Sequence, residues 1–376
     1  MTDRRAPPDW DDIVAHGRQL GLAAVGLCRA RPWTANRARL EHHRESGRGA
    51  DMAFTLRRPA RSADPTRTMR NASTLLVGAL AYDDGAGAGC DSGELGATGH
   101  VAAYARSDHY GRLRALLSVL ADRLRSEGHR ALVLADDNAV LDKEAAWRAG
   151  VGWYGKNSLL LVPGLGSNVV LGSVVTDAPF DRTSAPVSDR CGPCRRCVAA
   201  CPTDAIDDHG TVDSRRCLSW LLQAPGSFPV EHRVALGRRI YGCDDCQDVC
   251  PPNRRTALVR RQVAADRLEP DGAEPDRSRV DGGATGGRIE WIDLLALLEL
   301  DDPALLEVVG RWYIAGRDPD VVRRNALVVL GNIAPDDPSI TEAVQQGIDR
   351  TLRRYSAAGP LLAEHAHWAL NRRRRR

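Results

Sequence analysis

The spacing of eight of the ten cysteines constrains this chain more than any other feature. Four follow C-x2-C-x2-C-x3-C-P from Cys191 to Pro202, and three follow C-x2-C-x3-C-P from Cys243 to Pro251, with Cys217 between the two runs. This is the spacing of bacterial two-cluster ferredoxins, in which the fourth thiolate of a run binds the other cluster. We therefore predict two 4Fe-4S clusters, one held by Cys191, Cys194, Cys197 and Cys250 and the other by Cys217, Cys243, Cys246 and Cys201.

Two other uses of cysteine fit this spacing less well. Zinc needs four ligands per site and normally pairs one C-x2-C with another, which leaves the third cysteine and the C-P endings unexplained. Disulfides are disfavoured because we recognise no secretory signal. The least specific function of such a region is electron transfer, so the question is what receives the electron.

Composition sets broad limits on the chain. Its 376 residues suffice for two or three domains. With 43% hydrophobic residues and no apolar run near about 18 residues, we expect a soluble protein with a sizeable core. The formal net charge of +3 is too small to indicate nucleic-acid binding, so any basic surface has to be local. Thiolate-bound clusters and the lack of a targeting segment predict a cytoplasmic location.

The first part of the chain alternates strands and helices. Hydrophobic periodicity predicts a first helix capped by Asp9 or Asp11, and a buried strand that ends at Cys28, which we expect in the core. The predicted elements that follow are a strand at 73–82, a helix at 110–128, a strand at 130–134 and a strand at 169–176. This alternation indicates an α/β domain, in which ligands collect at the carboxyl ends of strands.

Asp136 follows the strand at 130–134 and is therefore a candidate functional residue. The competing interpretation is that Asp136 caps a helix at 142–149. A glycine-bearing stretch at 149–161 would let the backbone approach a bulky ligand closely. It lacks the context of a dinucleotide site, and no phosphate-binding loop of the G-x4-G-K-[ST] type occurs. Cys90 lies in a polar loop and receives no role.

The last part of the chain reads as a linker and a set of short helices. Residues 264–288 are rich in Asp, Arg, Gly and Pro, which predicts a linker or exposed loop. Helices are expected at 291–300, 303–313, 319–332, 338–355 and 361–371, which suggests a small helical-repeat unit or a plain helical cap. We expect a basic surface for phosphate contacts from Arg311, Arg317, Arg323, Arg324, Arg350, Arg353, Arg354 and the tail Arg372 to Arg376.

Taken together, the motifs resemble the epoxyqueuosine reductases, cobalamin-dependent iron-sulfur enzymes that complete queuosine in the tRNA wobble position. The most specific match is R-I-Y-G-C-D-D-C-Q-D-V-C-P-P-N-R at 239–254. Further matches are G-A-D-M-A-F at 49–54, A-G-V-G-W-Y-G-K-N-S-L-L at 149–160, G-S at 166–167, C-P-T-D-A-I at 201–206, R-R-C-L-S-W at 215–220, R-R-N-A-L-V-V-L-G-N at 323–332 and E-H-A-H-W-A-L at 364–370. They cover nearly the whole chain in order.

The resemblance implies an α+β multidomain protein and a reaction. It implies a nitroreductase-like cobalamin domain (1–185), a ferredoxin-like two-cluster domain (186–258), a linker (259–288) and a HEAT-like helical domain for tRNA (289–376). The reaction is reduction of the epoxide by two electrons, with its oxygen leaving as water. The clusters, supplied by a low-potential electron donor, would pass electrons to cobalamin, and cobalt would do the hard chemistry. We expect a monomer.

Residue by residue, the resemblance makes Asp136 the proton donor, which requires burial to raise its pKa. It assigns cobalamin contacts to Arg57, Tyr104, Asn157, Ser158, Ser167 and Ser219. Three segments depart from the family pattern. Asp136 is followed by D-N-A instead of a small residue and proline, the usual G-[RK]-D-Y-H appears as S-D-H-Y-G at 107–111, and Ser173 replaces a more usual Glu.

Two alternative functions remain open from the sequence. A simple two-cluster electron carrier would need neither Asp136 nor a helical RNA platform. A cobalamin and iron-sulfur reductase of another substrate, such as a reductive dehalogenase, would have no use for the basic helical end.

Overall fold

The computed structural model of the chain describes residues 7–52, 54, 56–82, 96–256 and 289–375. The predicted linker at 264–288 and Cys90 lie outside the described residues. Among the described residues, no helix has the length and apolar character needed to cross a bilayer.

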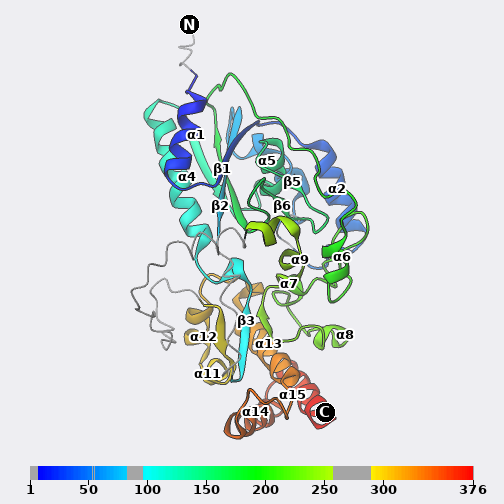
Figure 1. The fold of residues 1–376 in the computed structure, drawn as a ribbon. Coiled ribbons are helices and arrows are strands. Elements are labelled where there is room, and N and C mark those ends of the chain that lie inside the picture. The colour runs from blue at the N-terminus through cyan, green and yellow to red at the C-terminus, as the bar shows by residue number, and fades with distance from the viewer. Residues whose placement is uncertain (1–6, 53, 55, 83–95, 257–288, 376) are drawn as a thin grey trace, which may run out of the picture.

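Four strands form the sheet of the first domain, in the order β1-β2-β7-β4 (Figure 1). They are β1 (Ala24–Arg29), β2 (Thr74–Ala81), β7 (Val169–Thr176) and β4 (Ala131–Ala135). The central strands β2 and β7 are apolar along most of their length because both of their faces are covered. All three strand pairings are antiparallel, so the strand and helix alternation does not produce parallel neighbours. Each end of this sheet therefore carries the starts of some strands and the ends of others.

Helices cover both faces of this sheet. On one face, α1 (Trp10–Gln19) and α4 (His109–Ser126) bury a leucine-rich stripe against the strands. The side chain of Asp9 caps α1, and that of Asp108 caps α4. On the other face lies α5 (Asp142–Arg148), whose Ala145 and Ala146 pack on the sheet. The small side chains of these two alanines let the helix approach the strands closely.

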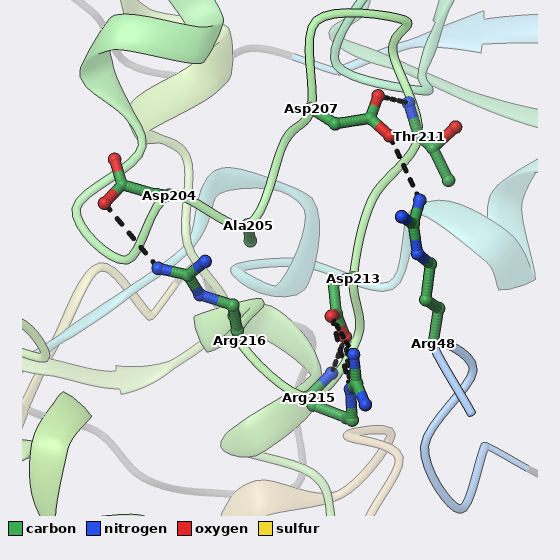
Figure 2. A pocket seen from close by; sticks show the side chains of 8 residues that line it. All are labelled: Arg48, Asp204, Ala205, Asp207, Thr211, Asp213, Arg215 and Arg216. Atoms are coloured by element: carbon green, nitrogen blue, oxygen red, sulfur yellow. Dashed lines mark hydrogen bonds and ion pairs between the residues drawn. The ribbon is translucent and has the colours of Figure 1, made fainter. Parts of the chain in front are cut away.

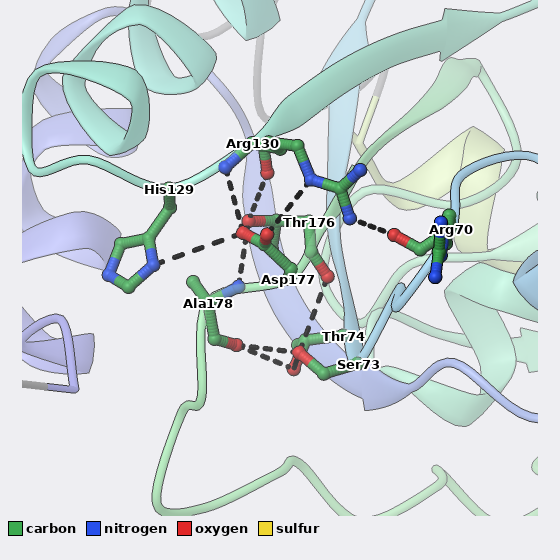
Figure 3. Close-up of polar contacts among 8 residues, drawn as sticks. All are labelled: Arg70, Ser73, Thr74, His129, Arg130, Thr176, Asp177 and Ala178. Atoms are coloured by element: carbon green, nitrogen blue, oxygen red, sulfur yellow. Dashed lines mark hydrogen bonds and ion pairs between the residues drawn. The ribbon is translucent and has the colours of Figure 1, made fainter. Parts of the chain in front are cut away.

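A network of polar contacts around Asp177 joins the strands at the end of the sheet where β7 finishes (Figure 3). Asp177 accepts hydrogen bonds from the backbone N–H of Arg130 at 2.7 Å and from its Nε at 3.0 Å, and His129 lies 3.9 Å away. Thr176 donates to the carbonyl of Arg130, and Ser73 donates to that of Ala178. The contacts fix the starts of β2 and β4 beside the end of β7, which leaves the opposite sheet end for the functional residues.

Shorter elements complete the first domain and the cysteine region. The first domain also contains α2 (Thr34–Glu45), α3 (Pro59–Ser62), η1 (Pro65–Arg67), η2 (Ala103–Ala105) and the hairpin of β5 (Trp153–Tyr154) and β6 (Leu160–Leu161). The cysteine region contains α6 (Arg196–Ala200), α7 (Leu218–Leu221), α8 (Val230–Arg233), β8 (Arg239–Tyr241) and α9 (Asp245–Asp248).

The C-terminal part is helical, as expected, with one exception. Its helices are α11 (Leu294–Glu299), α12 (Asp302–Val309), η3 (Ala315–Arg317), α13 (Pro319–Asn332), α14 (Glu342–Tyr355) and α15 (Pro360–Arg374). The exception is the first predicted helix, because Trp291–Asp293 is a strand, β9. Asp293 then caps α11 through two backbone N–H groups, so the helix begins only after it.

A second sheet joins the three parts of the chain. Its central strand β3 (Thr98–Val101) runs parallel to β8 from the cysteine region and antiparallel to β9 from the C-terminal part. One hydrophobic core extends beneath it from Val101 through Phe228 and Ile240 to Leu327. The cysteine region and the C-terminal helices therefore share a core, although the sequence places a linker between them (Figure 1).

Two arginines expected on the basic surface are instead buried. Arg323 is 8% exposed and Arg324 is 1% exposed. Arg324 donates to the carbonyls of Leu221 at 2.8 Å and Ala224 at 3.0 Å and also to Gly226, while Asn325 donates to Leu222 at 2.8 Å. Burial lowers the pKa of Arg324 to about 10, so it stays charged at neutral pH. The prediction that these arginines face solvent was wrong, because Arg324 binds carbonyls of a distant segment and Arg323 pairs with Asp302 and Asp320.

The arginine tail is also less exposed than predicted. Helix α15 continues to Arg374, and Arg373 is 6% exposed. Arg373 donates to the carbonyl of Ile333 at 2.6 Å and to the Gln345 side chain at 2.7 Å. Arg350, Arg353, Arg374 and Arg375 remain exposed.

We expect Arg324→Leu to lower the free energy of unfolding by at least about 2 kcal/mol, because buried carbonyls lose their donor. The urea midpoint, followed by tryptophan fluorescence, measures this change. The matched control is Arg350→Leu on the exposed face of α14, expected to change stability by less than about 0.5 kcal/mol. Equal midpoints for the two variants would contradict the bridging role of Arg324.

Candidate active site

Asp136 lies at the end of the sheet opposite the polar contacts around Asp177. It directly follows β4, whose last residue Ala135 pairs with Gly172 of β7. At the same edge the chain enters β7 through Asn168, whose carbonyl accepts from the backbone N–H of Tyr82 after β2. Asp136 has a φ of 53°, in the left-handed region that side chains other than glycine rarely adopt. Such strain is found at functional positions where the surrounding contacts enforce it.

The surroundings of Asp136 favour its protonated form. Burial raises the pKa of the Asp136 carboxyl; the charge of Arg114 opposes this shift and that of Asp137 supports it. The residue is nevertheless exposed to solvent. The carboxyl group is therefore surrounded by protein but can be reached from outside, as a proton donor to a bound molecule requires.

Asp136 does not cap the following helix. The N-cap position of α5 is Leu141, and no side chain caps it. The neighbour Asp137 stabilises its own turn by accepting from the backbone N–H of Ala139 at 2.8 Å. The two adjacent carboxyl groups thus have different roles, and the competing interpretation of Asp136 as a helix cap was wrong.

The charge of Asp136 acts on tyrosines from two other elements. Burial raises the pKa of Tyr110 on α4, and the charge of Asp136 raises it further. Asp136 acts in the same direction on Tyr241 of β8, after larger effects of burial and of Tyr104. The rings of Tyr104 and Tyr241 are 6.2 Å apart. The cysteine region therefore contributes directly to the surroundings of the candidate acid.

Of the six residues assigned to cobalamin, the structure brings Tyr104 and Ser219 together. Their side chains are hydrogen-bonded, and Gln223 donates to the Tyr104 hydroxyl at 3.3 Å. Ser167 is buried and donates to Gln247 at 3.0 Å, while its backbone N–H donates to Asn253 at 2.6 Å. These bonds place Ser167 at the junction with the cysteine region.

The other three assigned residues are more scattered. Ser158 has a φ of 59° and donates to the carbonyl of Gly210. Asn157 is 5% exposed, and its Nδ2 has no hydrogen-bond partner among the described residues. A buried amide without an acceptor fits a polar group of a bound cofactor. Arg57 is exposed before α3, and no hydrogen bond within the described residues ties it to the other five.

The altered segment at 107–111 has a structural explanation. Asp108 accepts from the backbone N–H of Gly111 at 2.8 Å and so begins α4. His109 stacks on Tyr82 with ring centroids 5.1 Å apart. Burial lowers the pKa of His109, so the ring is neutral at pH 7. Its Nε2 is buried without a partner among the described residues. The basic residue of the family is replaced here by a helix cap.

The charges of neighbouring cysteines act on one another in the cysteine region. Burial raises the pKa of the Cys250 thiol to about 11, and thiolates at Cys191, Cys197 and Cys194 raise it further. In the second group, burial raises the pKa of Cys246, and Cys243 and Cys217 add to the effect. Cys201 acts in the same way on Cys217. Most of these interactions join members that the ferredoxin spacing assigns to one cluster, but Cys197 of the first group also acts on Cys246 of the second.

The described residues contain no site for a single metal ion. Among the described residues, no three His, Cys, Asp or Glu side chains converge tightly enough to hold one metal ion. A 4Fe-4S cluster is larger, and its four thiolates bind different irons. Each cysteine in the described part of the chain is free, so disulfides do not compete for these thiols.

Ion pairs line a hollow between the loop around Arg48 and the cysteine region (Figure 2). Arg48 pairs with Asp207 at 3.1 Å, Arg215 with Asp213 at 2.5 Å, and Arg216 with Asp204 at 3.6 Å. Because each of these arginines is paired with an aspartate, the positive charges in the hollow are neutralised and do not form a basic binding surface.

Sequence reasoning missed two residues near Asp136. Asp142 is the first residue of α5, and burial together with the charge of Asp136 raises its pKa. Lys143 donates to the carbonyl of Ser158 at 2.8 Å, and its charge acts on Asp142 and Cys217. The local signal was an acidic residue at a helix start, which ordinarily indicates only an interaction with the helix dipole.

Comparison with known proteins places these features in one family. A family model described as a 4Fe-4S double cluster binding domain matches residues 190–253, which confirms the two-cluster prediction. The epoxyqueuosine reductase of Burkholderia pseudomallei is 35% identical over 93% of this chain and 95% of its own length. That of Pseudomonas aeruginosa is 30% identical over 99% of this chain and 98% of its own.

Solved structures agree with the sequence relatives. A crystal structure of epoxyqueuosine reductase with an epoxyqueuosine-modified tRNA-Tyr stem loop is 25% identical, with a TM-score of 0.79 over 96% of this chain and 89% of that chain. A Bacillus subtilis epoxyqueuosine reductase, with its catalytic aspartate loop swung out of the active site, is also 25% identical. Its TM-score is 0.76, again over 96% of this chain and 89% of that chain. The chain belongs to the epoxyqueuosine reductase family.

Proposed function

We propose that this chain reduces epoxyqueuosine in tRNA to queuosine, with Asp136 as the proton donor. The observation that carries the proposal is the position of Asp136 beside Tyr110 and Tyr241, in surroundings that raise its pKa. A simple electron carrier has no need of such an acid. The relative solved with an epoxyqueuosine-modified stem loop supports the same substrate.

The cofactors of the family fit the residues present. Two 4Fe-4S clusters, each bound by one set of four cysteines, would supply single electrons. Cobalamin, when bound, supplies a cobalt centre for the two-electron chemistry. Tyr104, Ser219 and the unpartnered amide of Asn157 are the residues that we propose hold the corrin side of the site. Ser219 is two residues from Cys217, so one short helix, α7, joins a cluster ligand to the site.

The protonation of Asp136 follows from its surroundings. An epoxide oxygen leaves poorly as an alkoxide, so a proton must reach it as the carbon–oxygen bond breaks. Burial favours the neutral carboxyl of Asp136, and solvent access lets the substrate reach it. Asp136 has a left-handed backbone immediately after the end of β4.

We also propose that the exposed arginines of the helical part bind the tRNA backbone. Arg350 and Arg353 lie exposed on α14, and Arg374 and Arg375 are exposed at the end of the described chain. Each contact with a phosphate would make binding more dependent on salt. The HEAT-like assignment, the monomeric state and the low-potential electron donor belong to this proposal, as does the cytoplasm, where reduced thiols persist.

Replacing Asp136 with asparagine should lower the rate of queuosine formation by about 10²- to 10⁴-fold, because the amide has no acidic proton. Nucleoside analysis of epoxyqueuosine-containing tRNA after one turnover measures the rate. Absorbance spectra of the clusters and of bound cobalamin should be unchanged. Asp137→Asn is the control and should lower the rate only slightly. A larger loss of rate in Asp137→Asn than in Asp136→Asn would show that Asp137, and not Asp136, is the acid.

Replacing Cys250 with serine should remove about half of the bound iron and sulfide, because one group loses a thiolate while the other keeps four. Iron and sulfide analysis of anaerobically reconstituted protein measures this. Cys28→Ser is the matched control, since Cys28 is buried in the core of the first domain. Full iron content in Cys250→Ser would overturn the predicted ligand groups.

The double variant Arg350→Glu and Arg353→Glu should weaken tRNA binding and flatten its dependence on salt, because two phosphate contacts are lost. Filter binding across a range of salt concentrations gives both quantities. The matched control is Arg37→Glu on α2, an exposed arginine outside the helical part. Equal affinity and equal salt slope in the double variant and the natural chain would remove α14 from the RNA surface.

A further inference from the structure

The two predicted cysteine groups differ in how close their loops lie to solvent. In the first group, the residues between Cys191, Cys194 and Cys197 are all exposed, namely Gly192, Pro193, Arg195 and Arg196. In the second group, Cys217, Cys243 and Cys246 are each followed directly by a buried residue, namely Leu218, Asp244 and Gln247. A cluster on the first group would therefore lie nearer the protein surface.

Hydrogen bonds hold the exposed cysteine loop in a defined shape. The ammonium group of Lys156 donates to the carbonyls of Gly192 at 2.6 Å and Cys194 at 3.0 Å. The side chain of Asp189 accepts from the backbone N–H of Cys191 at 2.8 Å. The backbone N–H of Cys194 donates to the carbonyl of Cys191 at 3.1 Å. A surface held in this way loses little conformational entropy when a partner binds.

Arginines gather around these exposed cysteines. Arg254 is joined to the first group through its backbone N–H, which donates to the carbonyl of Cys250 at 3.0 Å. The stretches 189–197 and 248–256 together contain five arginines and two aspartates, so the surface around the first group is positive. We call the arginines of these stretches the arginine rim, and all of them are exposed: Arg190, Arg195, Arg196, Arg254 and Arg255.

The arginine rim differs from the hollow of Figure 2, in which every arginine is paired with an aspartate. In the rim, Arg195 pairs with Asp208. Arg196, Arg254 and Arg255 form no ion pair with another residue in the part of the chain that the structure describes. Their charges are therefore available to a partner.

The second group lies on the side of the candidate active site. Helix α7 begins directly after Cys217, and the carbonyl of Ser219 in this helix accepts from the Gln223 side chain at 2.8 Å. The same Gln223 amide donates to the Tyr104 hydroxyl at 3.3 Å. Under the proposed function, electrons therefore enter at the first group and leave through the second.

We propose that the arginine rim is the docking surface for an acidic protein that carries single electrons at low potential. The inference rests on the proposed function and its predicted ligand groups. Arginine side chains attract a negatively charged partner and speed its encounter, while a small polar contact lets it leave after each transfer. Each encounter oxidises the carrier by one electron and reduces this protein by one, so two encounters supply one epoxide reduction.

The arginine rim is separate from the arginines proposed to bind tRNA. In Figure 1, α6, which begins at Arg196, lies beside the first domain, whereas α14 lies at the opposite end of the molecule. A carrier on the rim and a tRNA on α14 would therefore not compete for the same residues.

The test is the rate at which a reduced flavodoxin, a small acidic flavoprotein, reduces the cluster-loaded full chain in anaerobic stopped flow. Formation of the flavin semiquinone and bleaching of the cluster absorbance report each transfer. At low ionic strength, Arg196→Glu with Arg254→Glu should lower the second-order rate constant by at least about tenfold. Added salt should slow the natural chain and narrow the difference, because screening weakens the attraction.

Three controls separate docking from damage to the clusters. Arg18→Glu with Arg112→Glu makes the same change of charge at exposed positions on α1 and α4, away from α6 in Figure 1, and should keep the rate within about twofold. Arg196→Lys with Arg254→Lys keeps the positive charge and should retain most of the rate. Photoreduced deazaflavin, a small neutral reductant, should reduce all of these proteins at equal rates, with equal iron content.

The outcomes for the two proposals are distinct. Equal flavodoxin rates in Arg196→Glu with Arg254→Glu and in the natural chain at low ionic strength would overturn the docking surface. An equal loss of rate with deazaflavin would overturn it too, as would a loss of tRNA affinity without a loss of flavodoxin rate. Queuosine formation driven by deazaflavin should be the same in both proteins. Its absence from both would overturn the proposed function and leave the docking result standing.

Discussion

The convergence of eight thiols from three separate segments is the constraint on which the rest of this structure depends. Thiolates held close together in a medium of low polarity repel one another until iron neutralises them. Other contacts must therefore hold the segments together. The parallel pairing of β3 with β8 and the bonds from Arg324 and Asn325 to carbonyls at the end of α7 anchor two of these segments. The C-terminal helices are thus part of the framework of the clusters.

The same framework connects electron delivery to proton delivery. Helix α7 begins directly after Cys217 and carries Ser219, which is bonded to Tyr104. Tyr104 lies against Tyr241, and the charge of Asp136 reaches Tyr241. A cluster ligand and the candidate acid are therefore linked through a few packed side chains. Such packing keeps the distance between the two functions fixed, because tightly packed interiors deform little.

One of the left-handed residues lies at the place where chemistry is proposed. The antiparallel sheet presents β4 and β7 side by side, and the left-handed Asp136 turns the chain away immediately after β4. Asp137 closes the turn by accepting from the backbone N–H of Ala139. The residues D-N-A that replace the usual family pattern are compatible with this turn, because the carboxyl of Asp137 supplies the hydrogen bond that stabilises it.

The sequence by itself determined the local elements and the two-cluster character of the cysteine region. Hydrophobic periodicity located β1, β2, β4, β7 and α4, and Asp136 could be found because it follows a strand of clear pattern. Tertiary structure decided what depends on distant partners. Trp291–Asp293 is a strand because β3 pairs with it, and Arg324 is buried because its acceptors lie 98 to 103 residues away. The place of Asp142 beside Asp136 likewise depends on how α5 packs on the sheet, which no local pattern records.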